Sequence, residues 1–293
     1  FGSSGSNHFE GYLDEFRISN KCRYNTNFTA PTTAFSNDAN TILLIQSNTS
    51  NGSTTFIDSS GATPNTSGSI TSYVAANPTY GQSIVSYTGD GGTATVGHGL
   101  SSAPEMIMLK TRDTDQFWVV YHASNTANPE TEYLRLNGTN ATTDDTYWDD
   151  TAPTNAVFSL RSGAAVNKNN DKFIAYCFHS VSGYSKFGSY SGSGSSGNAI
   201  TTGFKPAFVL IKRSDSADNW HIIDNARSPT NPHNDVLRAN LSNAEATDNA
   251  SFDIDTTSTG FTVDSTNSEL NASGGTYIYM AFADKREYAY WLD

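Results

Sequence analysis

Short apolar segments, some of them alternating apolar and polar residues with a period of two, recur along this chain between stretches of Gly, Ser, Asn and Pro. This alternation puts successive side chains on opposite faces, as in a half-buried β-strand. The stretches Asn140–Asp145 and Asn240–Ala250 lean towards helix, although both also suit loops. Many short strands separated by turn residues predict an all-β fold of tandem β-sandwich or jelly-roll domains.

One pattern of strands occurs twice. Tyr87-Thr-Gly-Asp-Gly aligns with Tyr190-Ser-Gly-Ser-Gly, and the offset between aligned positions drifts from about 102 to about 104. The other paired segments are Met106–Lys110 with Phe208–Lys212, Phe117–Tyr121 with Asn219–Ile223, Tyr133–Leu136 with Val236–Arg238, Val157–Leu160 with Gly260–Val263, and Phe173–Phe178 with Tyr277–Phe282. This period is the length of a whole small domain, far above the roughly 20–50 residues of a solenoid repeat. A duplicated domain multiplies a surface and seldom builds one catalytic centre, so the pattern favours a binding or structural protein.

The segments before the duplication look like parts of other domains. Phe9–Ser19 is one alternating strand, which needs a partner strand upstream or in the next segment. That next segment has the apolar core Ile42–Ile45, typical of a strand covered on both faces. Asn65–Asn77 is poor in apolar residues and is predicted to be a linker. The predicted divisions are 1–36, 37–82, the two copies at 83–182 and 183–284, and a tail at 285–293.

Composition and charge narrow the choice of partners. Hydrophobic residues make up 36% of the chain and charged residues 16%, both below the soluble average, and a composition this rich in Ser, Thr, Asn and Gly is typical of extracellular or virion β proteins. With 17 basic against 29 acidic residues the net charge is −12, and the densest basic run is Lys285-Arg286. We therefore expect neither nucleic acid nor an anionic membrane surface as partner, because both require a basic face.

The two cysteines predict neither a disulfide framework nor a zinc site. Cys177 lies in the apolar run Phe173–Phe178 and is expected to be a buried free thiol, whereas Cys22 lies in a polar loop; a disulfide between them is the alternative. No segment approaches the roughly 18 apolar residues of a membrane helix, so no membrane insertion is expected. The chain begins at Phe1 in a Gly/Ser loop, and we expect it to be the C-terminal part of a longer polypeptide.

Several motifs resemble known families. Gly11-Tyr-Leu-Asp-Glu-Phe-Arg-Ile-Ser-Asn20 resembles the closing strand of laminin-G-type, concanavalin-A-like jelly rolls, and Thr41-Ile-Leu-Leu-Ile with Gly52–Gly61 resembles their opening strands. In the duplicated part, Val96-Gly-His-Gly-Leu and Gly274-Gly-Thr-Tyr-Ile-Tyr-Met-Ala-Phe-Ala resemble a domain of structural proteins from marine bacteriophages. That resemblance implies a virion appendage such as a tail or head fibre, and it transfers no catalytic residue.

The carboxylates do not form a glycosidase pattern. Glycosidases need two carboxylates about 5–9 Å apart across the scissile bond, and on the concanavalin-A-like fold these come from alternate positions of one strand. Adjacent acids such as Asp14-Glu15 and Asp144-Asp145 would point to opposite faces of a strand. No Gly-x-Ser-x-Gly elbow is present, and the Gly192–Gly197 run lacks the lysine of a phosphate loop. We therefore expect no enzyme activity.

Aromatic side chains are the best candidates for ligand binding, because exposed Trp and Tyr rings stack on sugars. The candidate ligand-binding residues are Trp118 and Trp220 at matching positions, and Tyr147, Trp148 and Asp149 in a polar stretch. Packing of the rings in the core or onto the sheet is the alternative. A structural calcium would take its oxygens from Asp113, Asp115, Asp253 and Asp255, with solvated loop acids as the alternative. No other cofactor is expected.

The sequence thus predicts a non-enzymatic virion protein, a phage tail or head fibre that attaches to a host-surface glycan and contacts other virion proteins. Exposed edge strands need covering and phage fibres are usually trimers, so a homotrimer is expected. The alternatives are a ligand-free capsid decoration or fibre spacer, and a secreted bacterial lectin-like adhesin. All three place the protein in a virion or outside the cell.

Overall fold

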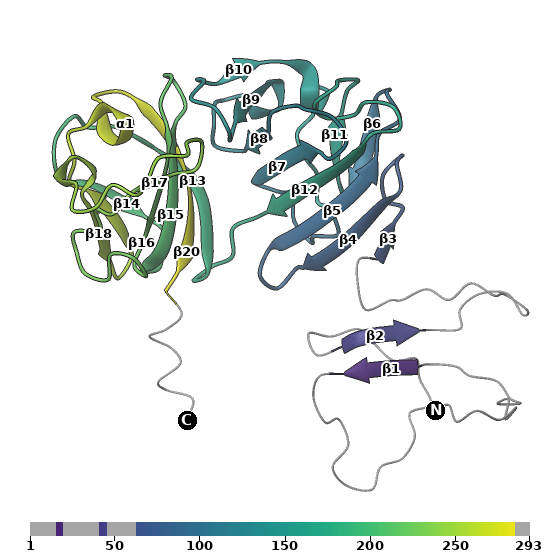
Figure 1. The fold of residues 1–293 in the computed structure, drawn as a ribbon, viewed down its shortest axis with the longest axis horizontal. Coiled ribbons are helices and arrows are strands. Elements are labelled where there is room, and N and C mark those ends of the chain that lie inside the picture. The colour runs from purple at the N-terminus through teal and green to yellow at the C-terminus, as the bar shows by residue number, and fades with distance from the viewer. Residues whose placement is uncertain (1–15, 20–40, 46–62, 285–293) are drawn as a thin grey trace, which may run out of the picture. The chain divides into compact units, whose positions relative to one another are not determined.

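Antiparallel sheets make up nearly all of the regular structure, as the alternating pattern predicts (Figure 1). The computed structural model describes residues 16–19, 41–45 and 63–284. The chain divides into two units between Thr63 and Pro64. In the first unit, β1 (Phe16–Ser19) pairs antiparallel with β2 (Thr41–Ile45). The strand that the sequence predicts within Phe9–Ser19 therefore takes its partner from the segment that follows it. The strand and turn of Gly52–Gly61, Cys22 and the tail 285–293 lie outside the described residues.

Copy 1, taken as residues 83–182 with the two strands β3 and β4 that precede them, is a sandwich of a large and a small sheet. The large sheet has the order β10-β9-β8-β7-β12-β5-β4-β3 and the small sheet pairs β11 with β6. The elements are β3 (Thr63–Asn65), β4 (Ser72–Asn77), β5 (Gln82–Thr88), β6 (Ala94–Gly97), β7 (Met106–Thr111), β8 (Val119–His122), β9 (Glu132–Arg135), β10 (Thr143–Asp144), β11 (Val157–Leu160) and β12 (Lys172–Phe178), with the 3-10 turns Pro129–Thr131 and Thr146–Trp148. The core between the sheets includes Val85, Phe158 and Phe173, all fully buried.

The predicted linker Asn65–Asn77 is largely strand. β4 pairs antiparallel with β5 from Ser72 opposite Tyr87 to Asn77 opposite Gln82, and β3 extends the same sheet. These strands satisfy the backbone groups that β5 would otherwise leave open at the edge of the sheet. β4 therefore belongs to the same compact unit as the copies, which begins at Pro64. β4 buries only Ser72 and Val74 on one of its faces, so its sequence gives a weak strand signal.

Copy 2, residues 183–284, repeats the sandwich. Its sheets have the orders β13-β20-β15-β16-β17 and β14-β19-β18. The elements are β13 (Ser185–Ser191), β14 (Asn198–Thr201), β15 (Pro206–Arg213), β16 (Trp220–Asp224), β17 (Leu237–Arg238), β18 (Ile254–Thr257), β19 (Gly260–Val263), β20 (Thr276–Ala283), the 3-10 turn Ala250–Phe252 and the short helix α1 (Ser268–Asn271). The stretches Asn140–Asp145 and Asn240–Ala250 contain no α-helix. Asn267 caps the start of α1, and its side chain accepts a hydrogen bond from the Glu269 amide.

The two copies share one topology. The order β9-β8-β7-β12-β5 in copy 1 matches β17-β16-β15-β20-β13 in copy 2, and the pair β11-β6 matches β19-β14. Tyr87 stacks on Phe173 with ring centroids 5.1 Å apart, and Tyr190 stacks on Tyr277 at 4.9 Å, both at an interplanar angle of 10°. Equivalent strands thus carry equivalent core contacts, as the sequence alignment of the copies predicts.

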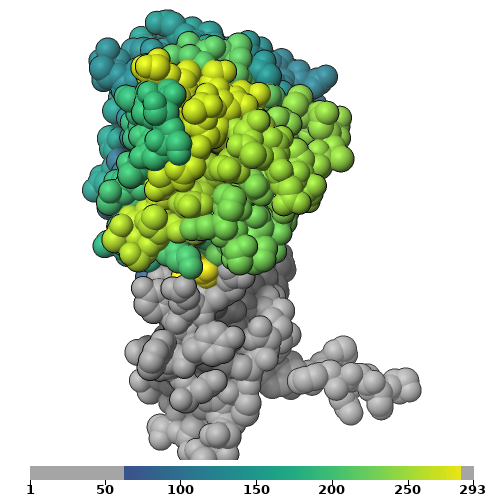
Figure 2. Space-filling view, turned by 90° about the vertical axis from the view of Figure 1, so that its left-hand side faces the viewer, coloured from purple at the N-terminus to yellow at the C-terminus, as the bar shows by residue number. Residues whose placement is uncertain are grey.

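The outer faces of the two large sheets pack against each other. Alternation on β7 sends Ile107 into the core of copy 1 and Met106 towards copy 2, where it joins one buried cluster with Trp220. The indole Nε1 of Trp220 donates to the backbone oxygen of Arg135 at 2.8 Å across this contact. In Figure 2 the green and yellow segments of copy 2 lie directly against teal segments of copy 1. Each large sheet is therefore covered on both faces where the copies meet.

Candidate functional site

The predicted aromatic candidates divide by burial. Trp148 and Trp220 are each 1% exposed, and the Nε1 of Trp148 donates to the backbone oxygen of Glu132 at 3.0 Å. Neither ring offers a face to a sugar, so for both the expectation of ligand contact is corrected to core packing. Tyr147 is half-buried against Tyr133, with ring centroids 4.9 Å apart. Trp118 is half-buried too, and its ring lies 6.2 Å from that of Tyr176.

Two of the predicted acids hold the backbone in turns. Asp149 ends the turn at Trp148 with a positive φ of 53°, and its carboxylate pairs with Arg161 at 2.8 Å. The Asp113 carboxylate accepts the Lys172 amide at 2.8 Å. Its equivalent in copy 2, Asp215, accepts the Thr276 amide at 3.2 Å. Because both copies use this aspartate in the same way, its role is structural.

The calcium ligand set is not assembled. Asp115 is exposed and Asp253 accepts a hydrogen bond from the Asn234 side chain at 3.2 Å. Burial raises the pKa of Asp255, and the charges of Asp264 and Asp253 raise it further. Within the described ranges, no group of three or more His, Cys, Asp or Glu residues is placed to hold a metal ion. Cys177 is buried as a free thiol, and burial raises its pKa to about 12, as expected for an inert core cysteine.

A buried asparagine fixes the Gly-rich loop of each copy, a role that the sequence comparison missed. Asn167 accepts the Asp90 amide at 3.0 Å and donates to the Gly92 oxygen at 2.9 Å. Asn271 accepts the Ser193 amide at 2.7 Å and donates to the Ser195 oxygen at 2.8 Å. The Gly192–Gly197 run is therefore a tied hairpin loop rather than a ligand cradle. The recurrence of Asn at offset 104 was the available signal.

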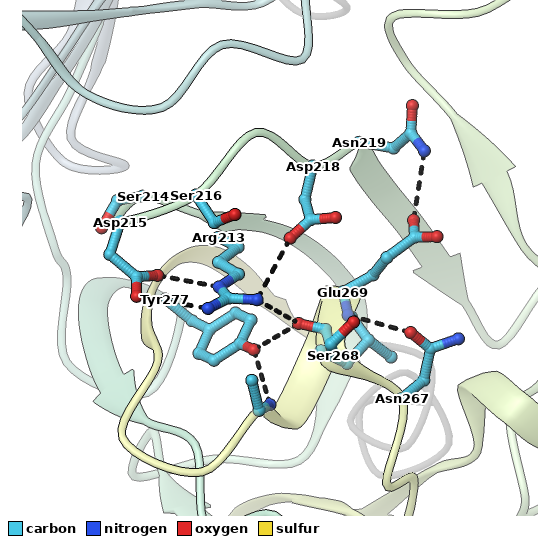
Figure 3. A network of polar contacts seen from close by, with 12 residues as sticks. Arg213, Ser214, Asp215, Ser216, Asp218, Asn219, Asn267, Ser268, Glu269 and Tyr277 are labelled. Atoms are coloured by element: carbon cyan, nitrogen blue, oxygen red, sulfur yellow. Dashed lines mark hydrogen bonds and ion pairs between the residues drawn. The ribbon is translucent and has the colours of Figure 1, made fainter.

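A network of polar contacts in copy 2 surrounds Arg213 (Figure 3). Its Nε donates to Asp215 at 2.9 Å, and its Nη1 lies 3.5 Å from Asp218 and 3.3 Å from the Ser268 oxygen. Tyr277 donates to the same Ser268 oxygen at 2.6 Å. Burial raises the pKa of Asp218. The guanidinium thus ties the end of β15 to the short helix α1.

Glu269 extends this network towards the core. Its Oε2 lies 2.8 Å from Nε2 of the fully buried His221 and accepts from Asn219 at 3.1 Å. The hydrogen bond from His221, followed by that from Asn219, lowers the pKa of the Glu269 carboxyl to about 2. The three carboxylates of the network, Asp215, Asp218 and Glu269, are thus held by Arg213, His221 or Asn219, and none of them is positioned as a free general acid or base.

Copy 1 fills the equivalent place with apolar side chains. Val119 stands where copy 2 has His221, and Ala165 where it has Glu269. Phe117 replaces Asn219 and receives the Arg135 guanidinium 4.0 Å from its ring centroid. The two copies keep the same fold with either solution, so we assign the Arg213–Glu269 network to stability.

The two copies differ most on the outer faces of their large sheets. In copy 2, the outward positions Phe187, Trp220, Ile278 and Met280 are between 1% and 9% exposed under copy 1. The matching positions of copy 1 are Ile84, Trp118, Ile174 and Tyr176. Ile84 is 48% exposed and the other three are half-buried; Tyr73, beside them on β4, is 52% exposed. We call these five residues of copy 1 the uncovered face.

Strand register makes the uncovered face continuous. Tyr176 lies opposite Ile84 on β5, and Ile84 lies opposite Ala75 on β4. Ile174 and Tyr73 both lie opposite Ser86 in the next row. Directly opposite side chains on antiparallel strands are about 5 Å apart, so the five residues form one patch. Single exposed apolar residues are ordinary, whereas a contiguous patch marks an interaction surface. Period-two alternation with the differences between the copies could have revealed it.

No helix within the described ranges is long and apolar enough to cross a membrane. A family model described as Domain of unknown function (DUF7483) matches residues 17–286. The search of curated proteins and the search of solved structures each gave no match.

Proposed function

The chain belongs to the family described as Domain of unknown function (DUF7483), and from the geometry of its two copies we propose that it is a non-enzymatic structural protein of a phage virion. In this proposal it is a tail or head fibre or appendage that attaches to a glycan on the host surface. The attachment surface is the uncovered face of copy 1, in place of the buried Trp148 and Trp220.

The observation that carries this proposal is the difference between two equivalent sheet faces. The fold buries all four equivalent positions of copy 2, so an uncovered Ile84 or Tyr176 in copy 1 is not a requirement of the sandwich. Trp118 and Tyr176 lie with ring centroids 6.2 Å apart and an interplanar angle of 30°. Partly exposed aromatic rings that lie side by side on a sheet suit the apolar faces of sugar rings.

The non-enzymatic part of the proposal is supported by the state of the ionisable groups. In the polar network around Arg213, the carboxylates are paired with Arg213, His221 and Asn219. Fixed charge pairs of this kind stabilise a fold, whereas catalysis needs a titratable group facing a substrate.

The ligand-free spacer is the second candidate, and the firm contact between the copies favours it. Besides the Trp220 bond, Nε2 of His122 lies 3.2 Å from the Tyr279 oxygen, and the Thr142 amide donates to the Ser214 oxygen at 2.8 Å. Such a contact transmits force along a fibre without any ligand.

A glycan array probed with the whole protein separates the two candidates. Attachment predicts binding to a related set of glycans that is weakened by Trp118→Ala, while the spacer predicts no binding by the folded protein. A Trp118→Ala variant that binds every glycan as the wild type does would remove the uncovered face from the proposal. The position of the protein in an intact particle, determined by labelled antibody and electron microscopy, tests the virion assignment.

A further inference from the structure

Three cationic side chains lie at one end of the uncovered face. On β12, Lys172 lies on the same face of the strand as Ile174 and Tyr176, because the three occupy every second position, and it therefore points outward. Lys110 is outward on β7 and lies opposite Ile174. Arg112 follows β7, and its amide donates to the Lys172 oxygen at 2.7 Å. Arg112 and Lys172 are exposed, and Lys110 is half-buried.

None of these three cations has a carboxylate partner within the described part of the chain. Among the described residues, no ion pair involves Lys110, Arg112 or Lys172, although Arg161 and Lys168 elsewhere in copy 1 are both paired with aspartates. The nearest acid in sequence, Asp113, turns its carboxylate to the Lys172 amide. The Lys110 ammonium donates to the Thr111 oxygen at 3.2 Å. In a chain of net charge −12, a group of unpaired cations beside aromatic rings is unusual.

The duplication shows that the fold does not require this charge. At the positions of Arg112 and Lys172, copy 2 has Ser214 and Thr276. Ser214 is buried and its amide donates to the Thr276 oxygen at 2.8 Å, so the backbone contact is the same. Like charges directly opposite each other on neighbouring strands destabilise a sheet. Copy 1 therefore carries a pair of like charges, Arg112 and Lys172, that copy 2 lacks, and a bound anion would offset their repulsion.

The cations and the aromatic rings belong to neighbouring rows of the sheet. The register of β7 with β8 pairs Leu109 with Val119, and its continuation brings Lys110 opposite Trp118. Trp118 in turn contacts Tyr176. The apolar platform and the charges thus lie within about two strand spacings, roughly 10 Å, of each other.

We propose that the uncovered face of copy 1 binds a linear polysaccharide that carries carboxylate or sulfate groups. Its sugar rings lie on Trp118 and Tyr176, and its anionic groups contact Arg112, Lys172 and Lys110. The inference rests on the proposed glycan attachment and names the class of glycan. Arginine binds both carboxylates and sulfates through a bidentate fork, so the shared chemistry is a planar or tetrahedral oxyanion on a sugar chain.

The test is affinity electrophoresis of the full chain in native gels that contain alginate, dextran sulfate or neutral dextran. Alginate supplies carboxylates and dextran sulfate supplies sulfates, so the two gels distinguish the sources of the anion. We expect retardation by at least one of them, weakened by salt, and none by dextran. The variant R112S/K172T gives copy 1 the side chains of copy 2, and its dissociation constant should rise about tenfold. Trp118→Ala should weaken binding as well.

The matched control is R161S/K168A, which removes the same charge from two exposed cations that are already paired with Asp149 and Asp171. It should bind as the wild type does. R112S/K172T should unfold at the same or a higher denaturant concentration than the wild type, because it removes a like-charge pair. Lost binding in that variant then reflects the surface rather than unfolding.

Five results would overturn the inference. Equal retardation of R112S/K172T and R161S/K168A would show unspecific attraction, and so would equal retardation by inorganic polyphosphate. A wild type that forms dimers in light scattering, which R112S/K172T dissociates, would make the face a contact between copies of the chain. Binding only to neutral glycans on the array would refute the acidic class while leaving attachment in place, whereas binding to no glycan at all would refute both.

Discussion

Trp118 and Trp220 occupy the same place in two copies of one fold, so replacing each by alanine tests how the copies are held together. Their backbone surroundings match, since the Trp118 amide donates to Asn137 and the Trp220 amide to Asn240, both at 2.9 Å. Their burial differs: Trp220 is 1% exposed between the copies, whereas Trp118 is half-buried on the uncovered face.

The expected magnitudes follow from that difference. A fully buried Trp removes about 150–250 Å² from water, which at about 25 cal/mol per Å² is roughly 4–6 kcal/mol. Measured Trp→Ala changes in cores are about 3–5 kcal/mol, and Trp220→Ala should fall in this range because the Arg135 oxygen also loses its donor. Trp118→Ala loses a smaller buried area and no such bond, so about 1–2 kcal/mol is expected.

Equilibrium unfolding in urea, followed by far-UV circular dichroism, measures both variants without relying on tryptophan fluorescence. Trp220→Ala should lower the midpoint much more than Trp118→Ala, and the loss of the shared cluster should broaden or split the transition as the copies unfold separately. Equal losses for the two variants, or a larger loss for Trp118→Ala, would refute the buried contact between the copies.

Three further predictions concern the polar groups. The Glu269 pKa of about 2 lies below its ordinary 4.5, so the stability that this carboxylate contributes is present above about pH 4.5 and is lost as the pH falls towards 2. Glu269→Gln should therefore be less stable than the wild type at pH 7, and between pH 5 and 2 its free energy of unfolding should fall by on the order of 2 kcal/mol less than that of the wild type. Urea titrations measure both free energies, and parallel curves of stability against pH would contradict the prediction. Burial lowers the pKa of Lys212 from 10.5 to about 8, so above pH 8 the unfolded chain binds more protons than the folded one, and the stability of the wild type should rise with pH there. In thermal unfolding, Lys212→Met should abolish that rise between pH 8 and 9.5 and should be neutral or stabilising at pH 7. A rise with pH that is unchanged in Lys212→Met would reject a buried ammonium at this position. Asn271→Ala leaves the Ser193 amide without its acceptor and should lower the free energy of unfolding by about 1–3 kcal/mol, with faster hydrogen exchange in the 193–195 loop. Asn167→Ala should have the same effect in the 90–92 loop. Unchanged exchange in both variants would show that these loops are ordered without the asparagine.

Much of the fold could be predicted because its information is local. Short apolar segments bounded by turn residues predicted most strands of both copies, since a strand must place apolar residues on whichever of its faces is buried. The strand β4 and the helix α1 escaped prediction because their sequences carry little apolar signal; β4 forms because β5 needs an edge partner, and α1 forms because Asn267 caps it and Arg213 binds its first oxygen.

The candidate ligand residues were predicted less well than the fold. Sequence shows that Trp148 lies among polar residues, yet its ring packs under the sheet because the turn at Asp149 reverses the chain there. The copies also align Trp118 with Trp220 without showing that they differ in exposure. The structural role of Asp113 required the matching bond of Asp215, which appears only in three dimensions.

By itself the sequence determined an all-β chain with a duplicated unit, because strand periodicity and the spacing of two copies are properties of the chain alone. Only the tertiary structure decided which outward faces are covered. The copies meet off-centre, so that Trp220 and Ile278 are buried while Trp118 and Ile174 remain partly in solvent. The reason is that a sheet has two faces with the same local pattern, and which one meets water depends on the fit between surfaces far apart in sequence.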